Sequence, residues 1–219
     1  MKSLIKVMLI LAAIFATTFI LGRVIGILTV ENVRNWLEFV QTIHPAWVAA
    51  LVIALLFIDL FVAVPTLTIT ILAGFFLGCS QGFIAGLVGM SLAAFCGYAI
   101  ARRFGDRAIS LIVKDDAERV ALKEAFQNSG PAMIMLSRGA PIVPEVTACM
   151  AGATRMPFGR YMLFFLLSTV PYVGVAAYAG SISSVESPHP AIFAVIFLYG
   201  VMWTGWFLFR RHQRRLNNV

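Results

Sequence analysis

Long apolar runs, separated by short charged segments, divide this sequence and constrain its fold more than any other feature. A helix of about 20 apolar residues crosses the hydrocarbon core of a bilayer. Only 12% of the residues are charged, whereas soluble domains carry about a quarter. The sequence therefore predicts an all-α polytopic membrane protein, with one membrane domain over residues 1–219. Secreted disulfide scaffolds, nucleic-acid-binding proteins and ordinary cytosolic enzymes are excluded. The long runs are 4–21, 46–64, 83–101, 161–179 and 191–209.

The net charge of +7 comes from basic residues at the ends of these runs, where they face the cytoplasm and anionic lipids. If both termini and the segment 102–129 are cytoplasmic, all basic residues except Arg23, Arg34 and Arg138 lie inside. This topology predicts a multi-pass protein of a bacterial inner membrane, with no nucleic-acid partner.

The same topology constrains two further apolar segments. Residues 46–78 must begin and end on the outer side, and residues 132–153 on the inner side. Each is therefore predicted to be a re-entrant helical hairpin. A kinked transmembrane helix is the alternative for the second segment, because Pro141 and Pro144 remove backbone donors there.

The two predicted hairpins resemble each other. Asp59 precedes Pro65 by six positions, and Arg138 precedes Pro144 by six. Because the hairpins enter from opposite faces, they form a predicted inverted repeat, which would place a substrate site near the midplane between them.

Two less apolar segments are predicted to lie at the membrane surface. Residues 31–39 suggest an interfacial helix, with Trp36 and Phe39 as anchors. Residues 102–130 interleave charged and apolar residues, which indicates a cytoplasmic amphipathic helix. A turn at Ser129-Gly130-Pro131 is expected to end that helix.

Arg138 is the sharpest candidate for chemistry. A charge at membrane depth costs at least ~2.5–3.5 kcal/mol, so it must be paired, hydrated or used. Asp59 and Glu145 are the acids of the two hairpins and its natural counter-charges. An arginine fork fits a phosphate group, and a desolvated acid could carry a proton. The alternative is a buried ion pair that only fixes the packing of the hairpins.

Glycines in the first hairpin are predicted to have structural roles. Gly74, Gly78, Gly82 and Gly86 recur every four residues, a stripe that lets helices approach closely and permits a dimer without requiring one. Pro65 and Gly152 are structural candidates of the same kind. No enzyme motif or metal-ligand spacing occurs, so no catalytic residue, metal or cofactor is predicted.

Three segments resemble one known family. They are Leu72-Ala73-Gly74-Phe75-Phe76-Leu77-Gly78 after Pro65, then Gly97-Tyr98-Ala99-Ile100-Ala101-Arg102, then Arg138-Gly139-Ala140-Pro141-Ile142-Val143-Pro144. In this order they resemble the DedA superfamily, also called VTT-domain or SNARE-associated Golgi proteins, and its bacterial inner-membrane branch. The resemblance covers residues 64–181.

The resemblance implies two opposed re-entrant hairpins and a role in moving lipids between leaflets. Eukaryotic relatives are lipid scramblases, and bacterial relatives are linked to flipping of undecaprenyl phosphate or phospholipid, some of it proton-dependent. Arg138 matches the functional arginine of the family, and Asp59 is the candidate for its membrane acid. The sequence departs from the DedA type proper, which places a second arginine close after the prolines, where Glu145 stands here.

The residues and the resemblance together predict translocation of phospholipid or polyprenyl-phosphate head groups. The expected partners are anionic membrane lipids and protons, at a site formed by Arg138, Glu145 and Asp59 with Pro141 and Pro144. A proton-coupled transporter of a small anion or metabolite is one alternative. A membrane assembly or homeostasis factor without transport activity is another.

Overall fold

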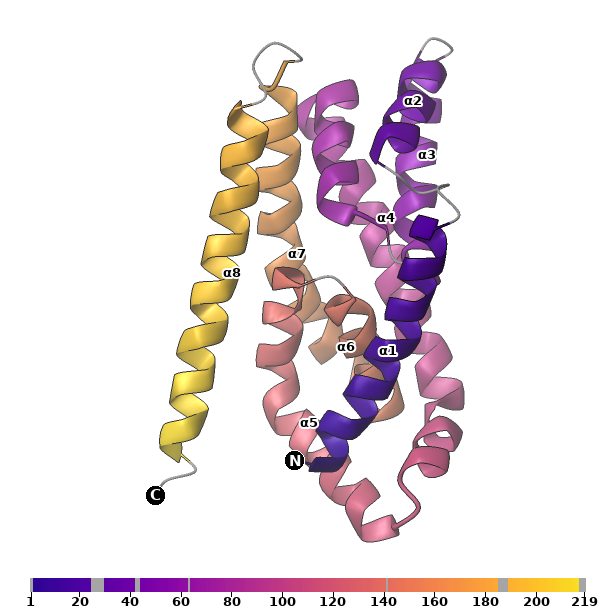
Figure 1. The fold of residues 1–219 in the computed structure, drawn as a ribbon, viewed down its shortest axis with the longest axis vertical. Coiled ribbons are helices and arrows are strands. Elements are labelled where there is room, and N and C mark those ends of the chain that lie inside the picture. The colour runs from indigo at the N-terminus through magenta and orange to yellow at the C-terminus, as the bar shows by residue number, and fades with distance from the viewer. Residues whose placement is uncertain are drawn as a thin grey trace.

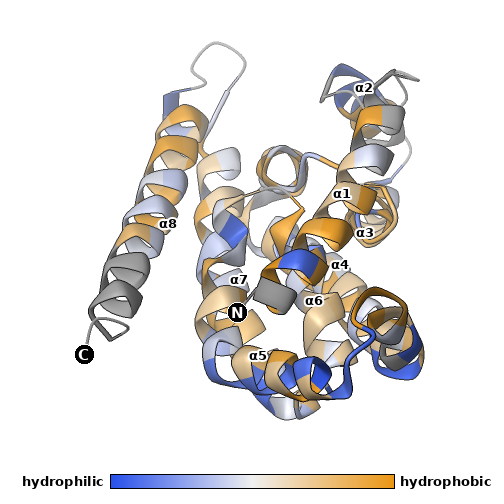
Figure 2. Ribbon diagram, turned by 60° about the horizontal axis from the view of Figure 1, so that its bottom comes forward, coloured by the Kyte–Doolittle hydropathy of each residue, from blue (hydrophilic) through white to orange (hydrophobic). Residues whose placement is uncertain are grey.

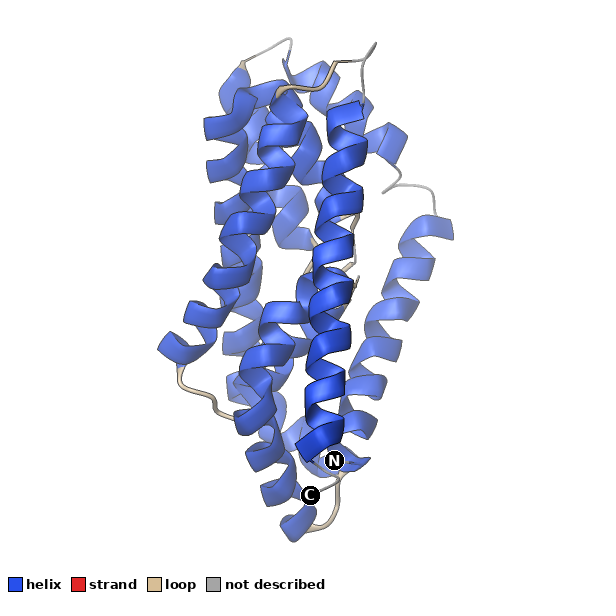
Figure 3. Ribbon diagram, turned by 90° about the vertical axis from the view of Figure 1, so that its left-hand side faces the viewer, coloured by secondary structure: helices blue, strands red, loops and turns tan. Residues whose placement is uncertain are grey.

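The computed structural model describes residues 2–24, 30–41, 44–62, 64–140, 142–184 and 189–216. All regular elements in these ranges are helices, and none of the described residues forms a strand (Figure 3). The predicted all-α fold is therefore confirmed. The helices are α1 (Lys2–Val24), α2 (Val30–Gln41), α3 (Pro45–Ile58), α4 (Thr66–Ile112), α5 (Asp116–Leu136), the short 3₁₀ helix η1 (Ser137–Gly139), α6 (Val143–Ala153), α7 (Phe158–Ser181) and α8 (His189–Leu216).

Three stretches of the described helices are long and apolar enough to cross a membrane, namely Thr66–Gly105, Phe158–Ser181 and His189–Phe207. Large apolar side chains also face outward on α8, where Phe193 is 67% exposed and Trp203 66%. An apolar surface of this extent is stable against lipid rather than water. The chain is a membrane protein.

Two helical hairpins approach each other from opposite ends of the bundle (Figure 1). In the first, α3 descends to mid-height and the chain turns upward into residues 66–77 of α4. In the second, α5 rises to mid-height and α6 descends. The structure thus contains two opposed hairpins. The first coincides with the predicted segment 46–78, whereas the second begins earlier than the predicted segment 132–153, because its rising arm is α5 from Asp116. Their re-entrant placement in a bilayer stays a prediction.

The first hairpin is followed by a sharp reversal inside α4. Gly78 has φ 77° and ψ 171°, a conformation that is open essentially to glycine alone, and it joins the helical segments 66–77 and 79–112. The segments then pack closely, because a Cβ at Gly82 would lie 2.7 Å from the carbonyl oxygen of Ala73. Gly78 itself has no neighbour within 4 Å of its Cβ position, so it serves the turn rather than the predicted packing stripe.

α4 and α7 form a close helix pair at the centre of the molecule. A Cβ at Gly74 would lie 2.1 Å from the carbonyl oxygen of Ala177, and one at Gly180 would lie 1.9 Å from that of Ile71. Small residues let two backbones approach to this distance, as is common among membrane helices. This packing fixes α7 against the second arm of the first hairpin, residues 66–77 of α4.

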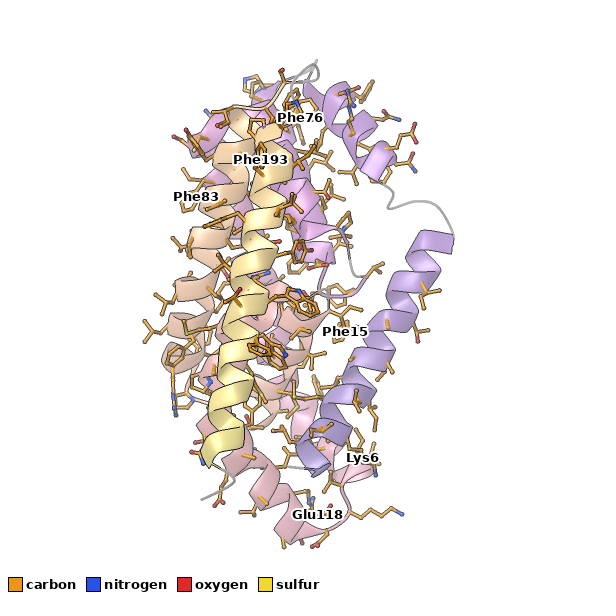
Figure 4. The ribbon with its side chains drawn as sticks, turned by 60° about the vertical axis from the view of Figure 1, so that its left-hand side comes forward. Lys6, Phe15, Phe76, Phe83, Glu118 and Phe193 are labelled. Carbon is orange, nitrogen blue, oxygen red and sulfur yellow. The ribbon has the colours of Figure 1, made fainter. Side chains whose placement is uncertain are left out.

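The charged segments gather at one end of the bundle. The start of α1, the end of α8 and the link between α4 and α5 lie at the lower end in Figure 1, and hydrophilic residues colour that link in Figure 2. Lys6 and Glu118 lie at this end, whereas Phe76 and Phe193 lie near the other (Figure 4). The predicted topology requires these segments to share one side. Which side of the membrane this is stays a prediction.

The surface segment 102–130 differs in detail from its prediction. Residues 102–112 continue α4, and a short link leads to α5, which Asp115 caps by accepting a hydrogen bond of 3.0 Å from the Ala117 backbone N–H. The predicted turn at Ser129-Gly130-Pro131 was wrong, because α5 runs through it without a break. Gly130 is buried there against Phe126 and Met156, so tertiary packing holds the helix.

Candidate functional site

The tip of the first hairpin is held together by Asp59. Its Oδ1 accepts a hydrogen bond of 2.8 Å from the backbone N–H of Val64, which closes the loop between α3 and α4. The carboxyl group is only 7% exposed. Pro65 directly precedes α4, where its missing N–H leaves no helical hydrogen bond unmade. The predicted acid therefore lies inside the protein, at the inward end of its hairpin.

The tip of the second hairpin positions Glu145. Ile142 adopts a left-handed conformation with φ 73°, which a branched side chain adopts only under strain. It directs the chain into α6, whose first turn contains Pro144 and Glu145. The unpaired backbone N–H groups of a helix start favour a carboxylate at this point. Pro141, the other predicted proline of the site, lies outside the described residues.

Arg138 lies in η1 and is bound by one face of α7. Its Nε and Nη2 donate to the Thr169 hydroxyl at 3.3 and 3.1 Å. The guanidinium carbon stands 5.1 Å from the ring centre of Phe165 and 5.7 Å from that of Tyr172. Aromatic faces attract a desolvated cation at these distances. Arg138 is thus held, at 8% exposure, by a polar and aromatic surface.

The predicted carboxylate partners of Arg138 lie close by without forming an ion pair. In the part of the chain that the structure describes, no carboxylate oxygen lies within 4.0 Å of the Arg138 nitrogens. Asp59 and Glu145, one from each hairpin, instead lie in the lining of one cavity with Arg138.

Glu145 is incompletely satisfied. Its side chain is 9% exposed, and its Oε2 is buried without a hydrogen-bond partner. A buried acceptor without a partner costs about 1–3 kcal/mol. Proteins keep few such groups, and those they keep call for an explanation such as a catalytic or ligand-binding role.

Arg138, Asp59 and Glu145 together line a cavity of about 270 Å³, here called the central cavity. Its wall includes Pro65 and Pro144, while Val195 and Tyr199 of α8 close one side. A narrower hollow continues past the same three ionisable residues to Met90, Tyr161 and Phe165. The structure therefore brings together all four described candidates for the site, Asp59, Arg138, Pro144 and Glu145, in the lining of the central cavity, beside Pro65, which was predicted to be structural.

The remaining predicted residues lie away from the central cavity. Gly74, Gly82 and Gly86 lie in helix contacts, and Gly152 lies where α6 crosses α4, since its Cβ would be 2.2 Å from the Tyr98 carbonyl oxygen. These are positions of close packing rather than of ligand contact.

Sequence reasoning missed the residues of α7 that hold Arg138. Phe165, Thr169 and Tyr172 follow one another at spacings of four and three, so they share one helix face. A polar residue between two aromatic residues on one face of an apolar span was the available signal. Nothing in that spacing showed which residue the face would contact.

Comparison with known proteins adds the family. The VTT domain matches residues 64–182, more than half of the chain. The chain belongs to the VTT-domain family. The resemblance to the DedA superfamily noted from the motifs is thereby confirmed.

This VTT-domain protein is also similar to an uncharacterized membrane protein of Synechocystis sp., at 25% identity over 179 residues, which cover 72% of this chain and 82% of the relative. No solved structure matches it. The matched VTT domain includes Arg138 and Glu145, whereas Asp59 lies just before its first residue.

Proposed function

We propose that this VTT-domain protein lets lipid head groups cross the membrane through the central cavity. The observation that carries the proposal is the burial of Asp59, Arg138 and Glu145 around one cavity, where, among the residues that the structure describes, Glu145 Oε2 has no hydrogen-bond partner and Arg138 forms no ion pair. Ionisable groups at membrane depth are expensive and characteristically functional. If these groups served packing alone, direct pairing would stabilise them better.

The chemistry of the cavity suits a phosphate-bearing head group. Arg138 is bound by a neutral hydroxyl and by aromatic faces, and no carboxylate of the described residues forms an ion pair with it, so its fork is not occupied by a carboxylate. An arginine fork binds phosphate with two parallel hydrogen bonds. The head group passes through the polar cavity while its acyl chains stay in the surrounding lipid. Because the head group remains among polar groups, it avoids most of the free-energy cost of losing its water in the hydrocarbon core.

The pair of carboxyl groups supports coupling to protons. Asp59 and Glu145 come from opposite hairpins and line the same cavity, where two neighbouring carboxylates repel each other and a proton on either would relieve that repulsion. An anionic head group that binds Arg138 would add negative charge beside Asp59 and Glu145 and so favour a proton on one of them. The protein would lie in a bacterial inner membrane, with both termini on the cytoplasmic side.

The test is lipid translocation by the purified protein in liposomes. Fluorescent phospholipid is placed in both leaflets, and dithionite is added outside, so bleaching well beyond half reports translocation. Arg138→Gln is expected to abolish the excess bleaching, and Arg138→Lys to retain part of it, because charge remains and the fork is lost. Arg160→Gln, at an exposed position near the start of α7, is the matched control.

A plateau at half for folded wild-type protein would contradict broad lipid translocation. The paired carboxyl groups would then favour a proton-coupled carrier of a small anion in the same cavity. Unchanged bleaching by folded Arg138→Gln would instead assign Arg138 to packing.

A further inference from the structure

A second hollow lies on the outside of the protein, between α4 and the start of α7. Its volume is about 600 Å³, and none of its lining residues borders the central cavity. It is called the interfacial basin here and is lined by Phe95, Tyr98, Ala99, Arg102, Arg103 and Phe158.

The interfacial basin lies at the edge of two apolar spans. The apolar run 83–101 of α4 is followed directly by Arg102 and Arg103. α7 begins at Phe158, just before the apolar run 161–179. Both spans therefore pass from hydrocarbon to water at this level, which is the depth of lipid head groups.

Arg102 is fixed at the rim of the basin. Its Nη1 donates to the Tyr98 hydroxyl and, at 3.4 Å, to the Met156 carbonyl oxygen. Its guanidinium carbon is 5.7 Å from the Tyr98 ring centre. Arg102 is nevertheless exposed, and its Nε and Nη2 form no hydrogen bond with the described residues. Arg103 is exposed beside it, with its guanidinium carbon 5.8 Å from the ring centre of Phe104.

Aromatic rings form the apolar floor of the basin. Phe158 meets Phe95 edge to face, with centroids 5.7 Å apart, and meets Tyr98 at 5.4 Å. Tyr98 in turn stacks on Tyr161 at 5.2 Å, and Tyr161 borders the hollow beside Arg138. The basin and the interior are therefore separate sites, with the two tyrosine rings between them.

We propose that the interfacial basin is a binding site for the phosphate group of an anionic phospholipid of the adjacent leaflet. Arg102 and Arg103 bind the phosphate oxygens, and the acyl chains lie along Phe95 and Phe158. Two arginines at head-group depth supply fork-shaped donors, and the rings below them supply apolar contact. The site is distinct from the central cavity, and binding to it does not require translocation.

The experiment is a titration of the full-length protein in detergent micelles with phosphatidylglycerol, followed by native mass spectrometry. Phosphatidylcholine and inorganic phosphate are the comparison ligands. The double variant Arg102→Gln/Arg103→Gln is expected to lower the affinity for phosphatidylglycerol about tenfold or more. Arg103→Gln alone is expected to lower it less and removes no hydrogen bond within the protein. The control is Arg107→Gln, which removes one exposed charge from the same helix outside the basin.

The outcomes are separable. Retained affinity in the folded double variant would overturn the proposal. An equal loss of affinity in Arg107→Gln would also overturn it, because it would indicate general attraction of the lipid to the basic end of the protein. Competition by inorganic phosphate at equal concentration would overturn it in favour of a soluble anion site. Wild-type protein that translocates lipid without binding phosphatidylglycerol would refute the basin alone. Wild-type protein that binds phosphatidylglycerol without translocating lipid would refute only the proposed function.

Discussion

Replacing Glu145 with methionine tests whether its carboxylate serves function or structure. The side chain is buried, and Oε2 has no partner, a state that costs about 1–3 kcal/mol. Methionine has a similar length and removes that penalty. It also removes the favourable position of a carboxylate at the start of α6, about 0.3–1 kcal/mol. We therefore expect Glu145→Met to raise the free energy of unfolding by about 1–2 kcal/mol.

The assay pairs two measurements on the same preparation. Unfolding in mixed micelles of increasing denaturing detergent gives the free energy, and the liposome assay gives the translocation rate. Glu145→Met is expected to be more stable than wild type and inactive. Glu145→Gln keeps the shape and hydrogen-bonding capacity without the charge, so it reports on the charge alone.

The opposite result would refute this reasoning. Removing one partner of a buried ion pair destabilises a protein by about 3–5 kcal/mol, because the other charge is left uncompensated. A loss of that size in Glu145→Met, with translocation retained by the molecules that fold, would make Glu145 the structural counter-charge of Arg138.

Three further predictions concern the backbone, each checked by thermal unfolding in detergent. Gly74→Ala places a Cβ 2.1 Å from the Ala177 carbonyl oxygen and is expected to destabilise by about 1–3 kcal/mol or more, whereas Gly200→Ala, with open space around it, should be neutral or stabilising. Gly78→Ala meets no neighbour but forces φ 77°, so a loss of about 1–3 kcal/mol is expected from strain alone, and an unchanged midpoint would contradict the turn described. Arg155 has φ 57° just after α6, a backbone conformation that favours glycine. Arg155→Gly is therefore expected to stabilise the folded protein by about 1 kcal/mol. Destabilisation would show that the side-chain contacts of Arg155 outweigh the strain.

Much of the candidate site was accessible from the sequence because membranes restrict what a charge can do. Asp59, Arg138 and Glu145 stood out as ionisable residues in apolar segments, and they line one cavity in the structure. The expected ion pair with Arg138 was not found, since Thr169 and two aromatic residues of α7 bind its side chain instead. Spacing within one segment predicts a shared helix face, but it does not reveal which distant helix packs against that face.

The error at residues 129–131 has a comparable cause. Gly130 and Pro131 disfavour a helix locally, and the sequence offered no reason to overrule that preference. In the structure, Pro131 lies within α5, and Gly130 is buried beside Phe126 of the same helix and against Met156, which follows α6. Packing between elements overrides local propensity when the small residue is what makes the contact.

The stacked rings of Tyr98 and Tyr161 have a consequence for the electrical insulation of the bilayer. A protein that keeps a polar cavity inside the membrane must still prevent ions from leaking across it. Tyr98 borders the interfacial basin, and Tyr161 borders the hollow beside Arg138, so these two stacked rings, with centroids 5.2 Å apart, lie between the two spaces. We expect the resistance of the membrane to protons to fall when both tyrosines are replaced by small residues.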